Sequence, residues 1–151
     1  MFAVVVARVV RLAPNKERLS RRDSNACQER RTVIDAEQIT FVGRGWTVGL
    51  ANEAALKLRE SAQFWTESYP AMEYRHGPIS IATTGRATWA FGEVPDGLAE
   101  DVTATGAHFE HRDIDPLADL VRLHRLCLAK ARLAGVDPDR PRHLSRSIIL
   151  S

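Results

Sequence analysis

The sequence predicts an α/β protein whose strands form a mainly parallel sheet. Short β-prone runs alternate with helical patterns, a glycine turn joins the first strand to the first helix, and a capped helix ends the alternation. A helix between two strands is the usual crossover of a parallel sheet. The 151 residues amount to about one domain, and the 44% hydrophobic and 26% charged fractions are those of a globular protein.

The first strand and the first helix are predicted on either side of a glycine turn. Residues 39–42 form a short apolar run, which the Gly-Arg-Gly turn at 43–45 stops. From about Val48 to Ser68 apolar residues recur every three or four positions, which predicts one long helix. These positions are Leu50, Ala54, Leu58, Ala62 and Trp65.

The next elements continue the alternation. Residues 87–91 read as a second strand, residues 95–105 as a second helix and residues 107–110 as a third, short strand. A short helix is predicted over 32–38, whereas residues 1–12 fit a strand or a helix equally well.

A strong helix is predicted from Pro116 to Leu133. Asp115 is its expected N-cap, Pro116 takes the first helical position, and Gly135 stops it. Its apolar side consists of Leu117, Leu120, Val121, Leu123, Leu126, Cys127 and Leu128.

The basic excess of the chain lies near its N-terminus. Residues 1–31 carry eight Lys/Arg against three Asp/Glu, while the whole chain has a net charge of +2. With Phe2 as its one aromatic and no recognition motif, this segment is expected to be a solvated arm and not a nucleic-acid partner. Arg8 interrupts the apolar opening run far short of membrane-spanning length. We expect a cytoplasmic protein with no membrane partner.

Metal and redox chemistry are not expected. Cys27 and Cys127 are far apart and show no metal-ligand spacing, so both are expected to be reduced thiols. His108 and His111 lack a third ligand nearby. We expect neither a metal nor another cofactor.

Four ionisable residues point to proton-transfer chemistry. On a helix, Glu53, Lys57 and Glu60 fall at i, i+4 and i+7 and share one stripe, and His76 follows just before a Gly-Pro corner. Two carboxylates, an ammonium and an imidazole suit proton transfer on a small polar substrate. The simpler alternative is a solvated helix face with an ion pair and a histidine that caps a turn.

The stretch from Gly43 to Pro78 resembles the sugar isomerase (SIS) domain family, in particular the second SIS domain of glucosamine-6-phosphate synthases and related phosphosugar isomerases. The end of the chain, residues 139–147, is similar to the family's C-terminal tail, which closes over the sugar. The resemblance covers about residues 39–151. The matching positions in the first stretch are Gly43, Arg44, Gly45, Glu53, Ala55, Leu56, Lys57, Leu58, Glu60, Glu67, Glu73, His76, Gly77 and Pro78.

The resemblance implies an αβα sandwich with flavodoxin-like layering that represents the C-terminal SIS half only. Residues 1–38 are then a basic N-terminal segment, and residues 39–151 are the SIS-like domain with its closing tail. The implied ligand is a hexose phosphate. The implied ancestry is an aldose–ketose isomerase or an amino-sugar-phosphate deaminase.

The resemblance also implies roles for the four ionisable residues. Glu60 takes the position of the general base that moves a proton between C1 and C2 of the sugar. His76 takes that of the ring-opening histidine, which acts across a subunit interface. Lys57 and Glu53 take those of polar neighbours of an enediolate-like intermediate. The chemistry agrees, because a weakly acidic carbon needs an aimed base and the developing oxyanion needs a cation nearby.

Three departures from the family limit this reading. The Ser-rich phosphate loop of a first SIS half is not found, and residues 82–85 are only its nearest stretch. Arg146 stands where the synthase has an imine-forming lysine. Because a guanidinium is a poor nucleophile, Arg146 and Ser147 are expected to bind substrate instead. Without a glutaminase half, glutamine amidotransferase activity is not expected.

Two hypotheses therefore stay open at the level of sequence. The chain is either part of a phosphosugar isomerase or deaminase, or a truncated non-catalytic module that binds sugar phosphates or dimerises. Either way, we expect a homo-oligomer or a second chain that supplies the first SIS half, because an orphaned half exposes apolar faces.

Overall fold

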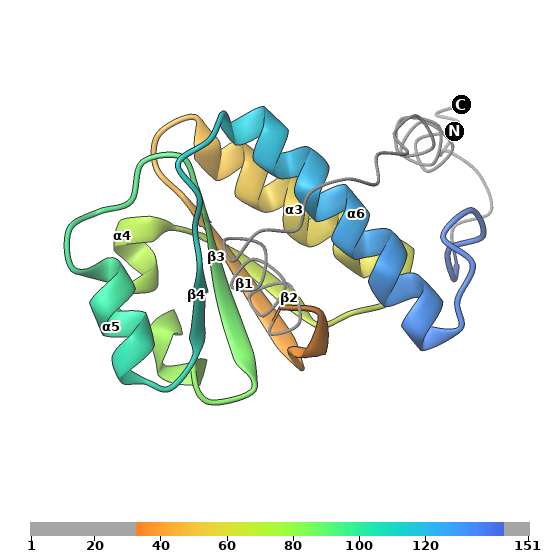
Figure 1. The fold of residues 1–151 in the computed structure, drawn as a ribbon, viewed down its shortest axis with the longest axis horizontal. Helices are drawn as coiled ribbons and strands as arrows, with labels where there is room; N and C mark the ends of the chain where they lie inside the picture. Colours follow the sequence, from red (N-terminus) through yellow and green to blue (C-terminus); the bar gives the residue numbers. More distant parts are fainter. Residues whose placement is uncertain (1–32, 144–151) are drawn as a thin grey trace, which may run out of the picture.

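The computed structural model describes residues 33–143 (Figure 1). Four strands form one sheet in the order β2-β1-β3-β4, and each neighbouring pair is parallel. The strands are β1 (Gln38–Gly43), β2 (Thr66–Pro70), β3 (Arg86–Phe91) and β4 (His108–Glu110). The helices are α3 (Thr47–Ala62), α4 (Ala71–Tyr74), α5 (Leu98–Ala104) and α6 (Pro116–Ala134), with a 3₁₀ helix η1 (Pro78–Ile81).

Helices cover both faces of the sheet. Figure 1 shows α3 and α6 side by side on one face and α4 and α5 on the other. Successive side chains of a strand point to opposite faces, so Phe41 and Trp89 pack in the cluster with α3 and α6. Val42 and Ala90 pack in the cluster with α4 and α5. This αβα sandwich is the predicted fold class.

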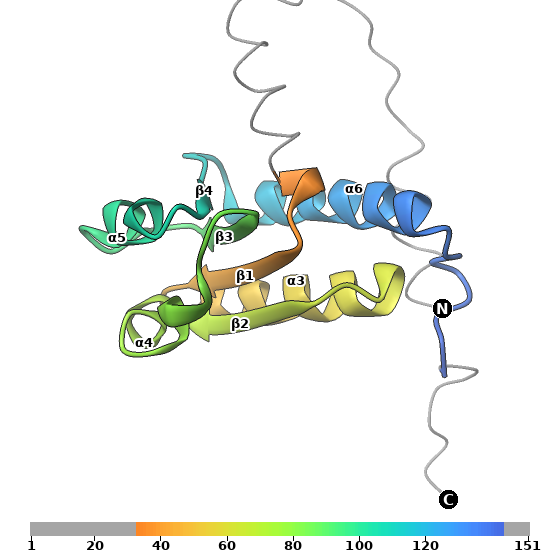
Figure 2. The ribbon, with the colours of Figure 1, turned by 90° about the horizontal axis from the view of Figure 1, so that it is seen from below.

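The strands read as buried runs because both faces of the sheet are covered. All six residues of β1 are buried, as are five of the six in β3. Figure 2 shows β1 and β2 running in the same direction beside each other. The predicted strands at 39–42, 87–91 and 107–110 are confirmed, each with bounds shifted by no more than one residue.

The predicted helix from Val48 to Ser68 is wrong in its last third. The helix ends at Ala62, where Gln63 adopts a left-handed conformation with φ of 53° and donates its N–H to Arg59 O. Residues 66–70 instead form β2, which pairs with β1. The strand lies at the sheet edge and four of its five residues are only half-buried, so its Thr-Glu-Ser-Tyr-Pro sequence lacks an apolar signal.

The capping signals of the last helix are confirmed. The Asp115 side chain accepts hydrogen bonds from Leu117 N at 2.8 Å and Ala118 N at 3.2 Å. Pro116 takes the first position, and Gly135 ends α6 with φ of 67°. The predicted helix at 95–105 begins later, at Leu98. Of the described residues in the predicted 32–38 helix, 33–35 are helical and the chain then enters β1 at Gln38.

Residues 1–32 of the predicted basic N-terminal segment, which include Cys27, lie outside the described residues, as do Arg146 and Ser147. Among the helices of residues 33–143, none is long and apolar enough to cross a membrane.

A close backbone contact fixes the start of α3. A Cβ added at Gly43 would lie 2.4 Å from the carbonyl carbon and oxygen of Thr47, so only glycine fits at the end of β1. Thr47 Oγ1 accepts a hydrogen bond from Arg44 N at 2.9 Å and lies 2.9 Å from Phe91 O, to which it donates. The helix start is thus joined to β1 and to β3.

We expect Gly43→Ala to destabilise the protein by roughly 1–3 kcal/mol, because the new methyl group overpacks the backbone of α3. Urea denaturation followed by circular dichroism measures the change. Gly49→Ala is the matched control, because its added Cβ meets nothing within 4 Å and it lies inside α3. It is expected to stabilise by about 0.5–1 kcal/mol. Equal effects of the two substitutions would contradict the close approach at Gly43.

Candidate functional site

Helix α3 brings three of the predicted site residues together. Lys57 Nζ lies 2.9 Å from Glu60 Oε2 and 3.7 Å from Glu53 Oε1. The Lys57 side chain is 15% exposed, whereas those of Glu53 and Glu60 are 38% and 34% exposed. The ammonium is therefore set deeper than the carboxylates that flank it. We call these three residues the α3 stripe.

The α3 stripe keeps its lysine charged. Burial by itself lowers the pKa of Lys57, but the hydrogen bond to Glu60 and the charges of Glu53 and Glu60 outweigh it and raise the pKa above its ordinary value. Two carboxylates and one ammonium leave the stripe with a net negative charge. A carboxylate that can accept a proton and an ammonium that can balance a negative charge thus lie within a single turn of helix.

Helix α6 adds two residues beside the stripe that the sequence analysis did not assign to it. His124 and Cys127 both interact electrostatically with Glu53 and Lys57. Cys127 is a free thiol, as predicted. Burial, only partly opposed by a hydrogen bond with Ser61, raises its pKa to about 12, so it is not a thiolate nucleophile. The sequence feature that could have drawn attention to His124 is that it is a polar residue among the apolar positions of α6.

His76 lies away from the α3 stripe. It follows α4, which packs against the opposite face of the sheet through Ala71 and Tyr74. Its side chain is exposed, and its backbone N donates to Glu73 O at 3.0 Å. Within residues 33–143 no hydrogen bond or ion pair joins it to the stripe. In a single chain the structure therefore brings together three of the four residues proposed for catalysis.

The carboxyl edge of the sheet holds a second group of polar residues. The strand order changes direction between β1 and β3, which is where open parallel sheets commonly bind ligands. Arg44, after β1, forms an ion pair with Glu93, after β3. Trp46 at the start of α3 is 65% exposed. The sequence predicted only a tight turn here, because the partner Glu93 is 49 residues away.

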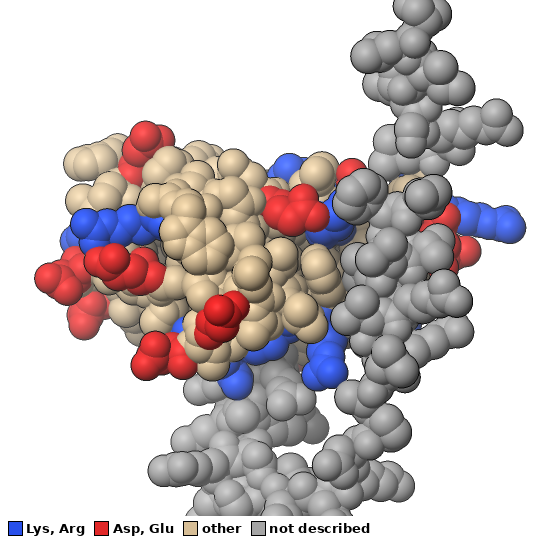
Figure 3. All heavy atoms as spheres, turned by 90° about the horizontal axis from the view of Figure 1, so that it is seen from above, with Lys and Arg blue, Asp and Glu red and all other residues tan. Residues whose placement is uncertain are grey.

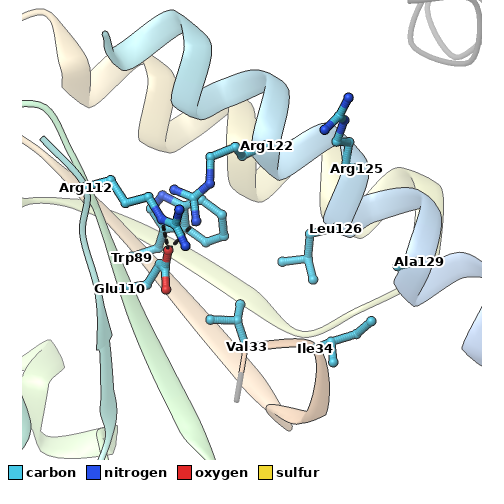
Figure 4. A pocket seen from close by; sticks show the side chains of 9 residues that line it. All are labelled: Val33, Ile34, Trp89, Glu110, Arg112, Arg122, Arg125, Leu126 and Ala129. Atoms are coloured by element: carbon cyan, nitrogen blue, oxygen red, sulfur yellow. Dashed lines mark hydrogen bonds and ion pairs between the residues drawn. The ribbon is translucent and has the colours of Figure 1, made fainter. Parts of the chain in front are cut away.

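A cavity of about 260 Å³ lies at the seam between β4 and α6 (Figure 4). Three of its four charged lining residues are paired: Arg122 with Glu110 and with Asp119, and Arg112 Nε with Glu110 Oε1 at 3.5 Å. Trp89 Nε1 also donates to Asp119 Oδ2 at 2.8 Å. This network ties α6 to β3 and β4. The lining residues are Val33, Ile34, Trp89, Glu110, Arg112, Arg122, Arg125, Leu126 and Ala129.

The network strongly favours the ionised form of Glu110. Burial raises the pKa of its carboxyl group, but hydrogen bonds from His108 and Arg122 and the charges of Arg122 and Arg112 hold it at about 2. His108 Nε2 lies 3.2 Å from Glu110 Oε2, while the other candidate metal ligand, His111, contacts Gly92 O at 2.9 Å. No group of three or more His, Cys, Asp or Glu side chains suited to a metal occurs in the described part.

Known proteins resemble this chain in both sequence and structure. The isomerizing glutamine–fructose-6-phosphate aminotransferase of Sulfolobus acidocaldarius is 31% identical over 133 residues, which cover 73% of this chain and 22% of the relative. The same enzyme of Thermococcus kodakarensis is 30% identical, and the match covers 78% of this chain and 24% of that relative. Glucosamine-6-phosphate deaminase of Thermotoga maritima matches in structure with a TM-score of 0.68 and 25% identity. The chain is thus similar in sequence and in fold to these enzymes, which agrees with the resemblance to sugar isomerase (SIS) domains noted in its sequence. No protein-family model matches the sequence.

The SIS relationship extends over only part of each relative. The match covers 77% of this chain and 41% of the Thermotoga deaminase. The C-terminal domain of glucosamine-fructose-6-phosphate aminotransferase from Francisella tularensis has the same fold, with a TM-score of 0.60 and 24% identity over 42% of its length. This chain thus spans less than half of these SIS proteins.

The Glu110 network predicts a specific acid sensitivity. The pKa of the Glu110 carboxyl group is about 2 in the folded state, against an ordinary value of 4.5. As the pH falls, this group is therefore protonated in the unfolded chain before it is protonated in the folded protein. The resulting stabilisation is complete above about pH 4.5 and is lost as the pH falls from there towards 2. Glu110→Gln should lower the midpoint temperature of unfolding at pH 7. Between about pH 4.5 and pH 2, the midpoint of this variant should fall less steeply with pH than that of the wild type.

Thermal unfolding between pH 7 and pH 2.5 tests this prediction. Glu100→Gln is the control, because Glu100 is exposed on α5. The control should follow the wild-type curve. A Glu110→Gln curve with the wild-type slope below pH 4.5 would show that the network does not stabilise the fold through this carboxylate.

Proposed function

We propose that this chain binds a hexose phosphate at the α3 stripe and that, in the assembled protein, it transfers a proton between adjacent carbons of the opened sugar. The observation that carries the proposal is Lys57 held between Glu60 at 2.9 Å and Glu53 at 3.7 Å. The sequence relatives named as aminotransferases of fructose 6-phosphate and the structural relative named as a glucosamine-6-phosphate deaminase support it.

The proposed step follows from the chemistry of the stripe. The Glu60 carboxylate takes the proton from the carbon next to the sugar carbonyl, and the electron pair of the broken C–H bond moves to the carbonyl oxygen as an enediolate forms. Lys57 stabilises that negative charge. Glu60 then gives the proton to the former carbonyl carbon. The hydroxyl proton of the adjacent carbon passes to the former carbonyl oxygen, so that the carbonyl now stands on that adjacent carbon. Glu53 helps to hold Lys57 in place, since both share one helix face.

The open position of the stripe supports assembly with a second copy. Figure 3 views the molecule from above and shows a broad surface made mostly of uncharged residues, with a few acidic side chains standing within it. Leu56 on α3 and Leu117 and Val121 on α6 are 41%, 56% and 40% exposed. These three residues lie on the two helices that run side by side over one face of the sheet, and exposed apolar side chains are often part of an interface. We propose a cytoplasmic homo-oligomer in which His76 of a second copy completes the site, with Arg146 and Ser147 of the tail contacting the sugar.

Replacement of the base should remove turnover. Fructose 6-phosphate and glucosamine 6-phosphate, each followed by NMR in the presence of the protein, test the isomerase and deaminase reactions. Glu60→Gln keeps the size of the side chain but cannot accept the proton, so we expect a loss of about 100-fold or more. Glu100→Gln, on the exposed side of α5, should leave turnover unchanged.

The outcomes separate the competing functions. Wild-type turnover in Glu60→Gln would show that another group is the base. Binding in calorimetry without turnover by the wild-type protein would favour the non-catalytic sugar-phosphate module. The absence of binding would overturn the proposal.

The proposed assembly predicts that a charge on the α3 and α6 face weakens association. Sedimentation of the wild-type protein at tens of micromolar (order of magnitude) should show an oligomer. Leu117→Asp should shift it towards the monomer, because a buried unpaired carboxylate is costly. Leu133→Asp is the control on the same helix, at a position that is 70% exposed at the opposite end of α6. A monomeric wild-type protein would contradict this part of the proposal.

A further inference from the structure

The cavity between β4 and α6 has a charged end and an apolar end. Figure 4 shows Glu110, Arg112 and Arg122 grouped at one end, with Val33 and Leu126 at the other. Its volume of about 260 Å³ lies just below the roughly 300–1,000 Å³ of sites for drug-sized ligands, so it suits a smaller molecule. No residue of the α3 stripe lines this cavity, which makes it a separate place on the fold.

Helix α6 supplies one complete wall of the cavity. Arg122, Arg125, Leu126 and Ala129 stand at i, i+3, i+4 and i+7, so they share one face of the helix. Leu123, the next residue after Arg122, packs instead in the core with α3. The same helix thus presents one face to the core and another to the cavity.

The charged end of the cavity is held rigid by its own contacts. Trp89 Nε1 donates to Asp119 Oδ2 at 2.8 Å, and the guanidinium carbon of Arg122 lies 4.9 Å from the centre of the Trp89 ring. Arg122 also forms ion pairs with Glu110 and Asp119. Side chains that are already fixed lose little further freedom when a ligand binds.

The cavity carries an excess of positive charge. With Asp119 counted through its pair with Arg122, three arginines adjoin two carboxylates, which leaves one positive charge over. Arg125 accounts for this excess, because within residues 33–143 it forms no ion pair and it is exposed at the rim. A concave site with an unbalanced charge attracts a counter-ion, and a guanidinium pairs with a carboxylate through two parallel hydrogen bonds.

We infer that this cavity binds a small organic monocarboxylate with an apolar body, whose carboxylate pairs with Arg125. One excess positive charge matches one carboxylate, whereas a phosphate monoester carries roughly two negative charges. Four of the nine lining residues are aliphatic and would leave the hydroxyl groups of a sugar unpaired. The inference is independent of the proposed function, because the α3 stripe takes no part in it.

Calorimetry on the full chain tests the inference with phenylacetate as the probe. A molecule of this size should bind with a dissociation constant of roughly 0.1–1 mM. Phenylacetamide has the same shape without the charge, and acetate has the charge without the apolar body. Each should bind about tenfold more weakly or worse. Excess fructose 6-phosphate should not displace phenylacetate.

Two substitutions test the two ends of the site separately. Arg125→Gln should weaken phenylacetate binding about tenfold, because a charged hydrogen bond is lost. Arg132→Gln is the matched control, since Arg132 is also exposed on α6 but does not line the cavity, and it should keep the wild-type affinity. Ala129→Phe should abolish binding by filling the cavity while every charge remains.

Circular dichroism checks that the variants are folded. If Ala129→Phe does not fold, Arg125→Gln decides alone, because its side chain is exposed. Absence of phenylacetate binding by the wild-type protein, or wild-type affinity in Arg125→Gln, would overturn the inference. Equal affinity for phenylacetamide, or displacement of phenylacetate by fructose 6-phosphate, would overturn it as well.

Discussion

The start of α3 is held against two strands at once, and the rest of the structure depends on this attachment. Gly43 lets the end of β1 come into contact with the Thr47 backbone, and Thr47 Oγ1 bonds to Phe91 O of β3. These contacts set where α3 begins over the sheet. The position and rotation of every later residue of α3 follow from where the helix begins. These contacts therefore also determine that Leu58 faces the core while Lys57 lies at the margin of the core.

The two charged clusters of the molecule differ in how their charges are balanced. At the seam of β4 and α6, Glu110 and Asp119 are almost fully buried and share Arg122. Such a network suits a structural role, because each charge already has its partner. In the α3 stripe, Glu53 and Glu60 remain partly exposed around one ammonium. Because the carboxylates outnumber the ammonium and are partly exposed, a group of the stripe can give up its present ion-pair partner and bind a ligand instead.

Local patterns predicted much of this fold, and long-range contacts account for what they missed. Asp115 and Gly135 marked both ends of α6 because capping depends on neighbouring residues. Strand β2 was missed because its pairing with β1, and not its polar sequence, makes it a strand. The α3 stripe followed from helical spacing. The electrostatic effect of Glu53 and Lys57 on His124 did not, because it comes from the packing of two helices that are far apart in the sequence.

The two edges of the sheet limit how copies of this chain can combine. Strand β2 is short, carries polar side chains and ends at Pro70, and β4 has only three residues. Prolines and short strands blunt a sheet edge against pairing with another backbone. Within residues 33–143, neither edge strand is a long template for pairing with the backbone of a neighbouring molecule. Any association of copies would therefore use side-chain surfaces, whose specificity is set by individual residues, and growth into fibres through strand pairing is disfavoured.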